Sequence, residues 1–309
     1  MKTQPEFRLE NLLETGKTVL SDGATGTFLQ YNGLEPGGCP EEFNISHPDI
    51  VKRMSKEYFE AGSDMVLTNS FGGNKFMLQK YGYGDRVDEF NRLAAKHATA
   101  NRPEGKFVLG SVGPTGEFVA PLGAVSSEEM SESFSEQIAG LVAGGVDGVT
   151  IETMTALEEA KLAISEARKH PGLTVMTTMT FDKGPRGLFT MMGVTPERAV
   201  KELIDAGSHV VGSNCGNGIE VMTEVARKMR QATTAPILIH SNAGIPTIRK
   251  GHILYPETPE FMANYFLELA DLGINFIGGC CGTTPKHIKA INSKLRSAQG
   301  TPFRTGGRS

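Results

Sequence analysis

The sequence lacks tryptophan, an excess of basic residues and any long apolar run. Lysine and arginine number 31 against 35 acidic residues, so the formal net charge is -4 at pH 7 and disfavours a nucleic-acid partner. No stretch approaches about 18 consecutive apolar residues, and the N-terminus has no apolar core of a secretory signal. We therefore expect no membrane association, and we predict that the protein is cytoplasmic.

Cysteine is also scarce, because the chain of 309 residues contains only 4. So few cysteines make a poor disulfide framework for a chain of this length. The adjacent pair Cys280 and Cys281 is instead a reasonable metal or redox feature in a reducing compartment. Cys39 lies in a loop rich in proline and glycine, and we interpret it as a bystander.

The chain alternates short apolar runs with longer amphipathic segments, and the runs begin roughly 25 to 46 residues apart. Such unbroken runs are typical of parallel strands buried on both faces. The eight runs are residues 18–24, 64–71, 107–114, 148–154, 173–181, 209–215, 236–244 and 276–282. Eight βα units without a composition shift predict an α/β protein, a single (β/α)8 TIM barrel over residues 18–296. We expect residues 1–17 to form an N-terminal capping segment and residues 297–309 to form a mobile tail.

Several predicted helices begin with recognisable capping residues. Threonine precedes proline at 195–196, 258–259 and 284–285, which puts a hydroxyl at the N-cap and proline at the first helical position. Ser46 and Asp49 resemble a capping box for a further helix.

Active sites of such barrels lie at the carboxyl ends of the strands, so the residues that end each run are candidates. Many of them are polar. The candidates are Asp22, Gly23, Thr25, Asn69, residues 113–116, Glu152, Asn214, Cys215, Asn242, Cys280 and Cys281.

Cys215, Cys280 and Cys281 are expected to converge on this rim. Three thiolates with a fourth coordination position left open are the pattern of a catalytic zinc site. The glycines that flank the adjacent pair would let both side chains reach one ion. Unpaired cysteines are also often buried as small apolar residues, and the spacing alone leaves both interpretations open.

Zinc held by three thiolates would deprotonate a substrate thiol and leave it nucleophilic, so thiol alkylation is the expected reaction. Glu152 could hold an ammonium group and the amides after Asp22 a carboxylate, which together would select an amino-acid thiol. A structural ion pair is the alternative role for Glu152.

Seven ordered motifs resemble the homocysteine S-methyltransferase family, and within it the homocysteine-binding module of cobalamin-dependent methionine synthase. The motifs are DGATGT at 22–27, TNSF at 68–71, GPTG at 113–116, IET at 151–153, SNC at 213–215, NAG at 242–244 and GGCCGTTP at 278–285. The resemblance extends from about Leu12 to Leu295.

The resemblance implies a (β/α)8 barrel in which Cys215, Cys280 and Cys281 bind zinc and through it serve catalysis. Asn242 is implied to occupy the open position on zinc until the substrate thiol displaces it. The residues implied to hold homocysteine are Asp22, Gly23, Ala24, Thr25, Glu152 and Asn214.

The methyl donor is less well defined by the resemblance. Because the sequence ends soon after the barrel, we expect methylcobalamin or another methylcorrinoid, bound to a separate carrier protein. S-methylmethionine or S-adenosylmethionine is the alternative. Betaine is disfavoured, because Phe71 stands where betaine-using relatives have a zinc-binding tyrosine and there is no tryptophan for a cation-binding cage.

Two other functions stay open at this point. One is a barrel lyase or aldolase whose glycine-rich loop after the last strand holds a phosphate and needs no zinc. The other is a thiol-binding subunit of a larger corrinoid methyltransferase complex, which would not turn over alone.

Overall fold

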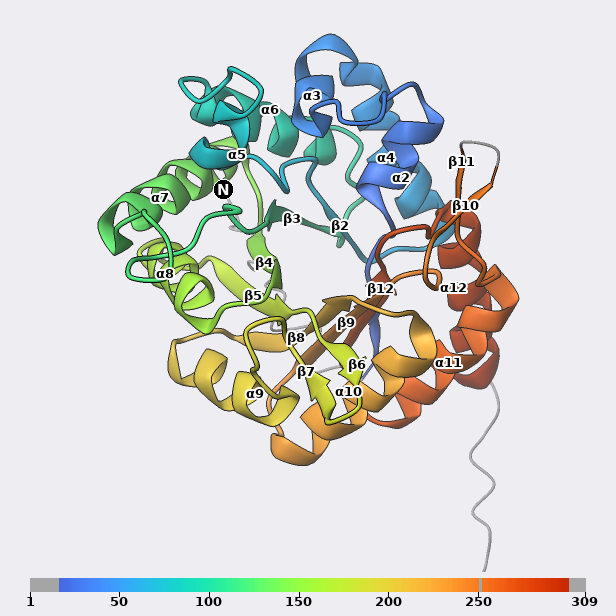
Figure 1. Ribbon diagram of the computed structural model, residues 1–309. Helices are drawn as coiled ribbons and strands as arrows, with labels where there is room; N and C mark the ends of the chain where they lie inside the picture. The colour runs from blue at the N-terminus through green and yellow to red at the C-terminus, as the bar shows by residue number, and fades with distance from the viewer. Residues whose placement is uncertain (1–16, 250–251, 300–309) are drawn as a thin grey trace, which may run out of the picture.

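The computed structural model describes residues 17–249 and 252–299. Eight parallel strands curl into a nearly closed barrel surrounded by helices (Figure 1), so the predicted (β/α)8 fold is confirmed. The strands are β1 (Val19–Leu20), β2 (Met65–Leu67), β3 (Phe107–Val112), β4 (Gly148–Met154), β5 (Thr174–Met179), β8 (Val210–Cys215), β9 (Ile237–Ser241) and β12 (Phe276–Gly279). Each of them lies within one of the eight predicted runs.

The helices form an outer layer around the strands. They are α2 (Thr25–Tyr31), α3 (Phe43–Ser46), α4 (Pro48–Ala61), α5 (Lys75–Gln79), α6 (Val87–Thr99), α7 (Ser127–Gly144), α8 (Leu157–Arg168), α9 (Pro196–Asp205), α10 (Ile219–Ala232), α11 (Pro259–Asp271) and α12 (Pro285–Gln299), with a 3-10 turn at Pro40–Glu42. Among these described helices, none is both long enough and apolar enough to cross a membrane.

Helix caps follow the sequence in part. Thr195 and Thr258 accept hydrogen bonds from backbone N–H groups at the starts of α9 and α11, as predicted. The capping box predicted at Ser46 is wrong, because Ser46 ends α3 and α4 begins after His47, which makes no side-chain cap. A complete capping box instead starts α7, between Ser126 and Glu129.

The barrel closes between β1 and β2, which stand at the two ends of the hydrogen-bonded strand order. Asp64 N donates to Leu20 O at 2.6 Å, and Leu20 N donates to Asp64 Oδ2 at 3.0 Å. Nearer the carboxyl end, Leu67 N donates to Asp22 Oδ2 at 2.7 Å. Two aspartate side chains thus supply hydrogen bonds where the backbone ladder is incomplete.

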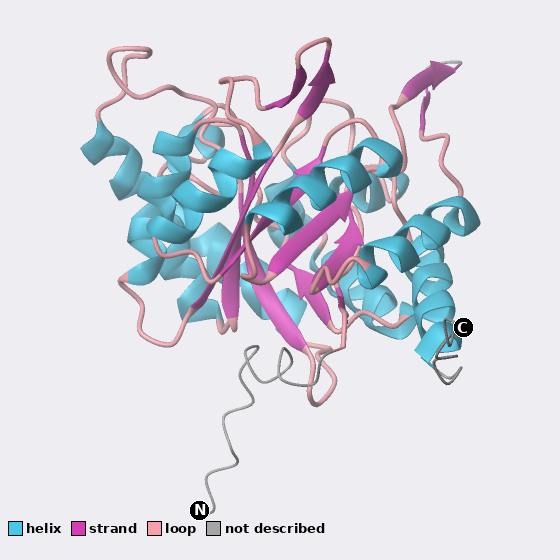
Figure 2. Cartoon of the chain, turned by 90° about the horizontal axis from the view of Figure 1, so that it is seen from below, coloured by secondary structure: helices cyan, strands magenta, loops and turns pink. Residues whose placement is uncertain are grey.

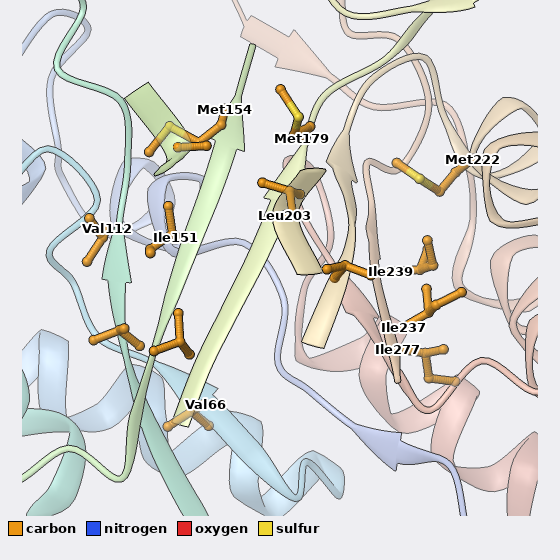
Figure 3. Packing of buried hydrophobic residues seen from close by; sticks show 14 of the residues in the cluster. Val66, Val112, Ile151, Met154, Met179, Leu203, Met222, Ile237, Ile239 and Ile277 are labelled. Carbon is orange, nitrogen blue, oxygen red and sulfur yellow. The ribbon is translucent and has the colours of Figure 1, made fainter. Parts of the chain in front are cut away.

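Two apolar clusters stabilise the barrel. One takes residues from every strand except β4, and strand residues two apart, such as Met65 and Leu67, share a face, so this cluster fills the interior. The larger cluster lies between strands and helices (Figure 3), where Ile239 and Ile277 of the sheet share it with Met222 of α10. Apolar residues on both faces explain why the strands read as unbroken runs.

Two hairpins extend from the barrel. They are β6 (Asp182–Gly184) with β7 (Gly187–Phe189), and β10 (Thr247–Arg249) with β11 (His252–Leu254). Both rise from the same end of the barrel (Figure 2). They belong to the connections that follow β5 and β9, so they border the rim where the strands end.

The predicted terminal segments fall mostly outside the described residues. Of the predicted capping segment only Lys17 is described, and α12 continues through Gln299, three residues into the predicted tail. The rest of the tail also lies outside the described residues.

Candidate metal and thiol-binding site

Three cysteine sulfurs lie together at the carboxyl end of the barrel. Cys215 ends β8, Cys280 and Cys281 follow β12, and all three Sγ atoms lie within 4.8 Å of one another. Cys215 has φ of +68° and Gly282 has φ of +82°. Cys280 and Cys281 lie beyond the end of β12, in a turn closed by the hydrogen bond from Thr283 N to Cys280 O at 3.1 Å, so strand alternation no longer separates their side chains.

Two of the sulfurs accept hydrogen bonds from asparagine side chains. Asn242 Nδ2 donates to Cys215 Sγ at 3.5 Å, and Asn214 Nδ2 lies 3.9 Å from Cys280 Sγ. The ring of Tyr255 packs on Gly282, which directly follows Cys281. The sequence indicated both asparagines, because they end predicted strands. Tyr255 lies in a connecting segment, where no sequence pattern indicated that it lies near the cluster.

The proton affinities of the sulfurs depend on one another. Hydrogen bonds with its two neighbours, together with burial, raise the pKa of Cys280 well above its ordinary value. The hydrogen bond with Cys215 and burial raise the pKa of Cys281 to about 12, whereas hydrogen bonds from both of these thiols lower the pKa of Cys215. One thiolate is therefore favoured, and three at once need a cation among them.

The donor set suits a thiophilic metal ion. Three cysteine sulfurs are the ligands that select zinc over magnesium or calcium. Asn242 Oδ1 is buried and has no hydrogen-bond partner among the described residues. A buried amide oxygen without a partner costs free energy, so this atom is available as a further oxygen donor.

Glu152 lies beside the cluster on β4 and is only 7% exposed. Its carboxylate accepts hydrogen bonds from Ser111 Oγ and, at 3.3 Å, from Asn214 Nδ2. Burial raises the pKa of Glu152 to about 7 against the opposing effect of the Ser111 hydrogen bond. Within the described part of the chain Glu152 makes no ion pair, which argues against the structural ion pair considered above.

Asn214 fixes the turn that follows Glu152. Its Oδ1 accepts from Thr153 N and from Thr178 Oγ1, both at 2.7 Å, and its Nδ2 donates to Thr153 Oγ1 at 2.7 Å. Thr153 has φ of +63°, and the register between β4 and β5 shifts next to it. A β-branched residue rarely adopts this backbone conformation, so Asn214 holds a strained turn in place.

The turn after Asp22 is tied to the cysteine loop. The Asp22 carboxylate is itself occupied, because it accepts from Leu67 N and Ser21 Oγ. Burial raises the pKa of Asp22 to about 7. Ala24 N donates to Thr283 Oγ1 at 3.1 Å, and a Cβ on Gly23 would lie 2.7 Å from the same oxygen.

The N–H groups of the first turn of α2, which begins at Thr25, precede the first intrahelical hydrogen bond and so need other partners.

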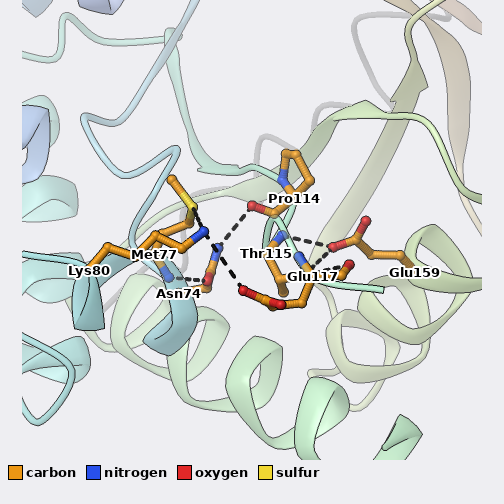
Figure 4. A network of polar contacts seen from close by, with 7 residues as sticks. All are labelled: Asn74, Met77, Lys80, Pro114, Thr115, Glu117 and Glu159. Carbon is orange, nitrogen blue, oxygen red and sulfur yellow. Dashed lines mark hydrogen bonds and ion pairs between the residues drawn. The ribbon is translucent and has the colours of Figure 1, made fainter. Parts of the chain in front are cut away.

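Two further rim segments have structural contacts. Asn69 Nδ2 donates to Pro40 O at 2.7 Å, which fixes the loop after β2. In the loop after β3, both N and Oγ1 of Thr115 donate to Glu159 Oε1 at 2.7 Å (Figure 4). Asn74 Nδ2 contacts Pro114 O in the same network. These contacts give Thr115, the one polar side chain of residues 113–116, a structural role.

The fold and the site together define a barrel protein with a cluster of three cysteines and a buried carboxylate at the carboxyl ends of its strands. Residues 19–295 match the model of the homocysteine S-methyltransferase family, and the chain belongs to this family.

Curated relatives include the methionine synthase of Mycobacterium leprae, 31% identical over 94% of this chain and 26% of the relative. The methionine synthase of Mycobacterium tuberculosis is 30% identical over 89% of this chain and 24% of the relative. The chain thus spans about a quarter of the length of these relatives. Among solved structures, the metallated homocysteine methyltransferase MmuM of Escherichia coli superimposes with a TM-score of 0.76 at 20% identity, covering 93% of this chain and 99% of that one.

Proposed function

We propose that this protein transfers a methyl group to the thiol of homocysteine, giving methionine, in a zinc-dependent reaction with a methylcorrinoid on a separate carrier protein as donor. The observation that carries the proposal is the three-sulfur cluster joined through Asn214 to the buried carboxylate of Glu152. Family membership and relatives named methionine synthase support homocysteine as the substrate.

Zinc would be held by Cys215, Cys280 and Cys281, with Asn242 Oδ1 as the donor that gives way to substrate. Bound zinc lowers the pKa of a coordinated thiol, so that the thiolate prevails near neutral pH. Four free cysteines in the described chain also agree with a reducing compartment, and we place the protein in the cytoplasm.

Glu152 would receive the ammonium group of homocysteine, because its carboxylate is buried and held in position by Ser111 and Asn214. The N–H groups at the start of α2, at Thr25, would receive the carboxylate of the substrate. These two contacts orient the thiol toward the mouth of the barrel. The substrate sulfur then forms a bond to the methyl carbon while the bond to the donor breaks, and the electron pair of that bond stays with the donor.

Metal analysis and methyl-transfer assays test the proposal together. We expect about one zinc per chain, and Cys280→Ala and Cys281→Ala should lose zinc and transfer activity while keeping helical content. Cys39→Ala is the matched control, because Cys39 lies outside the cluster and contacts Glu41. A zinc-free wild type that stays fully active would contradict the proposal.

The donor is tested by comparing methylcobalamin, free and on a carrier, with S-methylmethionine and S-adenosylmethionine. We expect slow transfer from free methylcobalamin and faster transfer from the carrier, because docking positions the methyl group beside the thiol. Rapid turnover with either alternative donor and none with methylcobalamin would refute the corrinoid assignment. Homocysteine binding without any transfer until a partner is added would identify a binding subunit instead.

A further inference from the structure

Glu257, between hairpin β10–β11 and helix α11, packs on glycines from the two loops that carry Cys215 and Asn242. At Gly218, in the loop after β8, an added Cβ would lie 2.4 Å from Glu257 Oε1. At Gly244, in the connection after β9, it would lie 3.1 Å from Glu257 Cγ. Both glycines have left-handed backbones, with φ of +103° and +86°. The side chain of Glu257 therefore occupies space that a side chain at either position would fill.

The hydrogen bonds of Glu257 extend to a third connection. Both of its carboxylate oxygens accept from Ile219 N at 3.2 Å, at the start of α10, the helix after β8. Its backbone N–H donates to Ala243 O at 3.0 Å. Its carbonyl oxygen accepts from His287 Nε2 at 3.1 Å, on α12, the helix after the cysteine pair. Glu257 therefore contacts the connections that follow β8, β9 and β12, the strands at whose ends the three cysteines and Asn242 lie.

The same connections are also joined to one another beside the sulfurs. Ala243, whose carbonyl oxygen accepts from Glu257, donates its N–H to Cys281 O at 2.9 Å. Asn242 Nδ2 donates to Gly216 O at 2.9 Å, which joins the loop after β9 to the loop after β8. The contacts of Glu257 thus lead to the cysteines through the backbones of their loops.

The three sulfurs come from two strand ends, and the paths of the loops bring them within 4.8 Å of one another. Ligands that are already held in the binding arrangement lose less conformational freedom when the metal binds. We propose that Glu257 is a positioning residue for the metal site, whose carboxylate reaches Ile219 N and so holds the loop of Cys215 in register with the loops of the other ligands. The inference rests on the proposed metal site but not on the identity of the methyl donor.

Two substitutions separate the reach of the carboxylate from its charge. Glu257→Asp keeps the charge but withdraws the oxygens from Ile219 N by one methylene group. Glu257→Gln loses the charge but keeps an oxygen at the same reach. We expect Glu257→Asp to weaken zinc affinity roughly ten-fold in a chelator competition and to shift the sulfur-to-metal charge-transfer absorption of the cobalt-substituted protein. Glu257→Gln should keep both the affinity and the spectrum of the wild type.

Glu260→Asp is the matched control, because Glu260 is exposed in the first turn of α11, and it should change neither property. A residue that only supports the fold stabilises metal-free and zinc-loaded protein equally, so its replacement leaves zinc affinity unchanged. Equal zinc affinities in Glu257→Asp and Glu257→Gln would therefore overturn the proposal. If Glu257→Asp does not fold, a loss of zinc affinity in folded Glu257→Gln would overturn it as well.

Circular dichroism and thermal unfolding of the metal-free variants establish that each is folded at the temperature of the titration. A wild type that binds zinc without methylating homocysteine would refute the proposed function alone, whereas a wild type that binds no zinc would overturn both.

Discussion

Replacing Glu152 with glutamine is the sharpest test of how the site selects its substrate. The substitution removes the negative charge but preserves the shape of the side chain. The glutamine oxygen can still accept from Asn214 Nδ2, and its amide can donate to the Ser111 hydroxyl, which accepts as well as donates. The variant should therefore fold and keep the cysteine cluster, so any loss reports on the substrate contact.

The expected loss follows from the chemistry of that contact. A hydrogen bond between charged groups contributes roughly 1.5 to 3 kcal/mol, which corresponds to about one to two decades in affinity. Only an amino-acid thiol presents an ammonium group to Glu152. We therefore expect the Glu152→Gln variant to bind homocysteine roughly 10- to 100-fold more weakly than the wild type does. Its affinity for propanethiol should equal that of the wild type.

Isothermal titration of both thiols into zinc-loaded protein measures the difference directly. Glu166→Gln is a suitable control, since Glu166 is also buried but lies on α8 and pairs with Lys169. It should leave both affinities unchanged. Equal losses for homocysteine and propanethiol in Glu152→Gln would show that Glu152 supports the structure and does not recognise an ammonium group.

The remaining predictions concern stability. Asp22 has its pKa raised to about 7 by burial, against 3.8 for a free aspartate, so ionisation costs stability as pH rises from about 4 through 7. In urea unfolding, the stability of Asp22→Asn relative to wild type should therefore rise by a few kcal/mol between pH 4 and pH 8; a pH-independent difference would contradict this. Gly212→Ala should be severely destabilised, because its Cβ would lie 1.8 Å from Leu238 O. In Gly26→Ala, on helix α2, nothing lies within 4 Å of the added Cβ, so the free energy of unfolding should stay within about 1 kcal/mol of the wild-type value or increase. Equal unfolding midpoints for Gly212→Ala and Gly26→Ala would refute the packing argument.

The barrel was predictable because its strands are buried on both faces. Val66 and Ile277 face the helices while Leu67 and Phe276 face the interior, so burial selects apolar residues at successive positions. Once eight such strands are placed in order, the topology brings their carboxyl ends to one rim. The meeting of Cys215 with the adjacent cysteine pair follows from that topology, without knowledge of any loop.

Features set by the paths of connecting segments could not be predicted. Tyr255 packs on Gly282, beside the cysteine pair, because the long connection after β9 folds back over the rim, and no periodicity marks such a path. The capping box at Ser126 carries the expected spacing to Glu129, but the same kind of spacing at Ser46 does not form one. Short capping patterns become informative only when the start of the helix is already known.

Asn214 shows how the site uses conformations that sequence patterns disfavour. Among the described residues other than glycine, only Thr153 and Cys215 have positive φ, and both lie at the site. Such conformations cost on the order of 1 to 3 kcal/mol each and persist only where surrounding contacts enforce them. Asn214 bonds to both the backbone and the side chain of Thr153 and directly precedes Cys215. The asparagine therefore holds the strained turn after Glu152 while its amide contacts both the Glu152 carboxylate and Cys280 Sγ, a demand on its side chain that substrate binding alone would not impose.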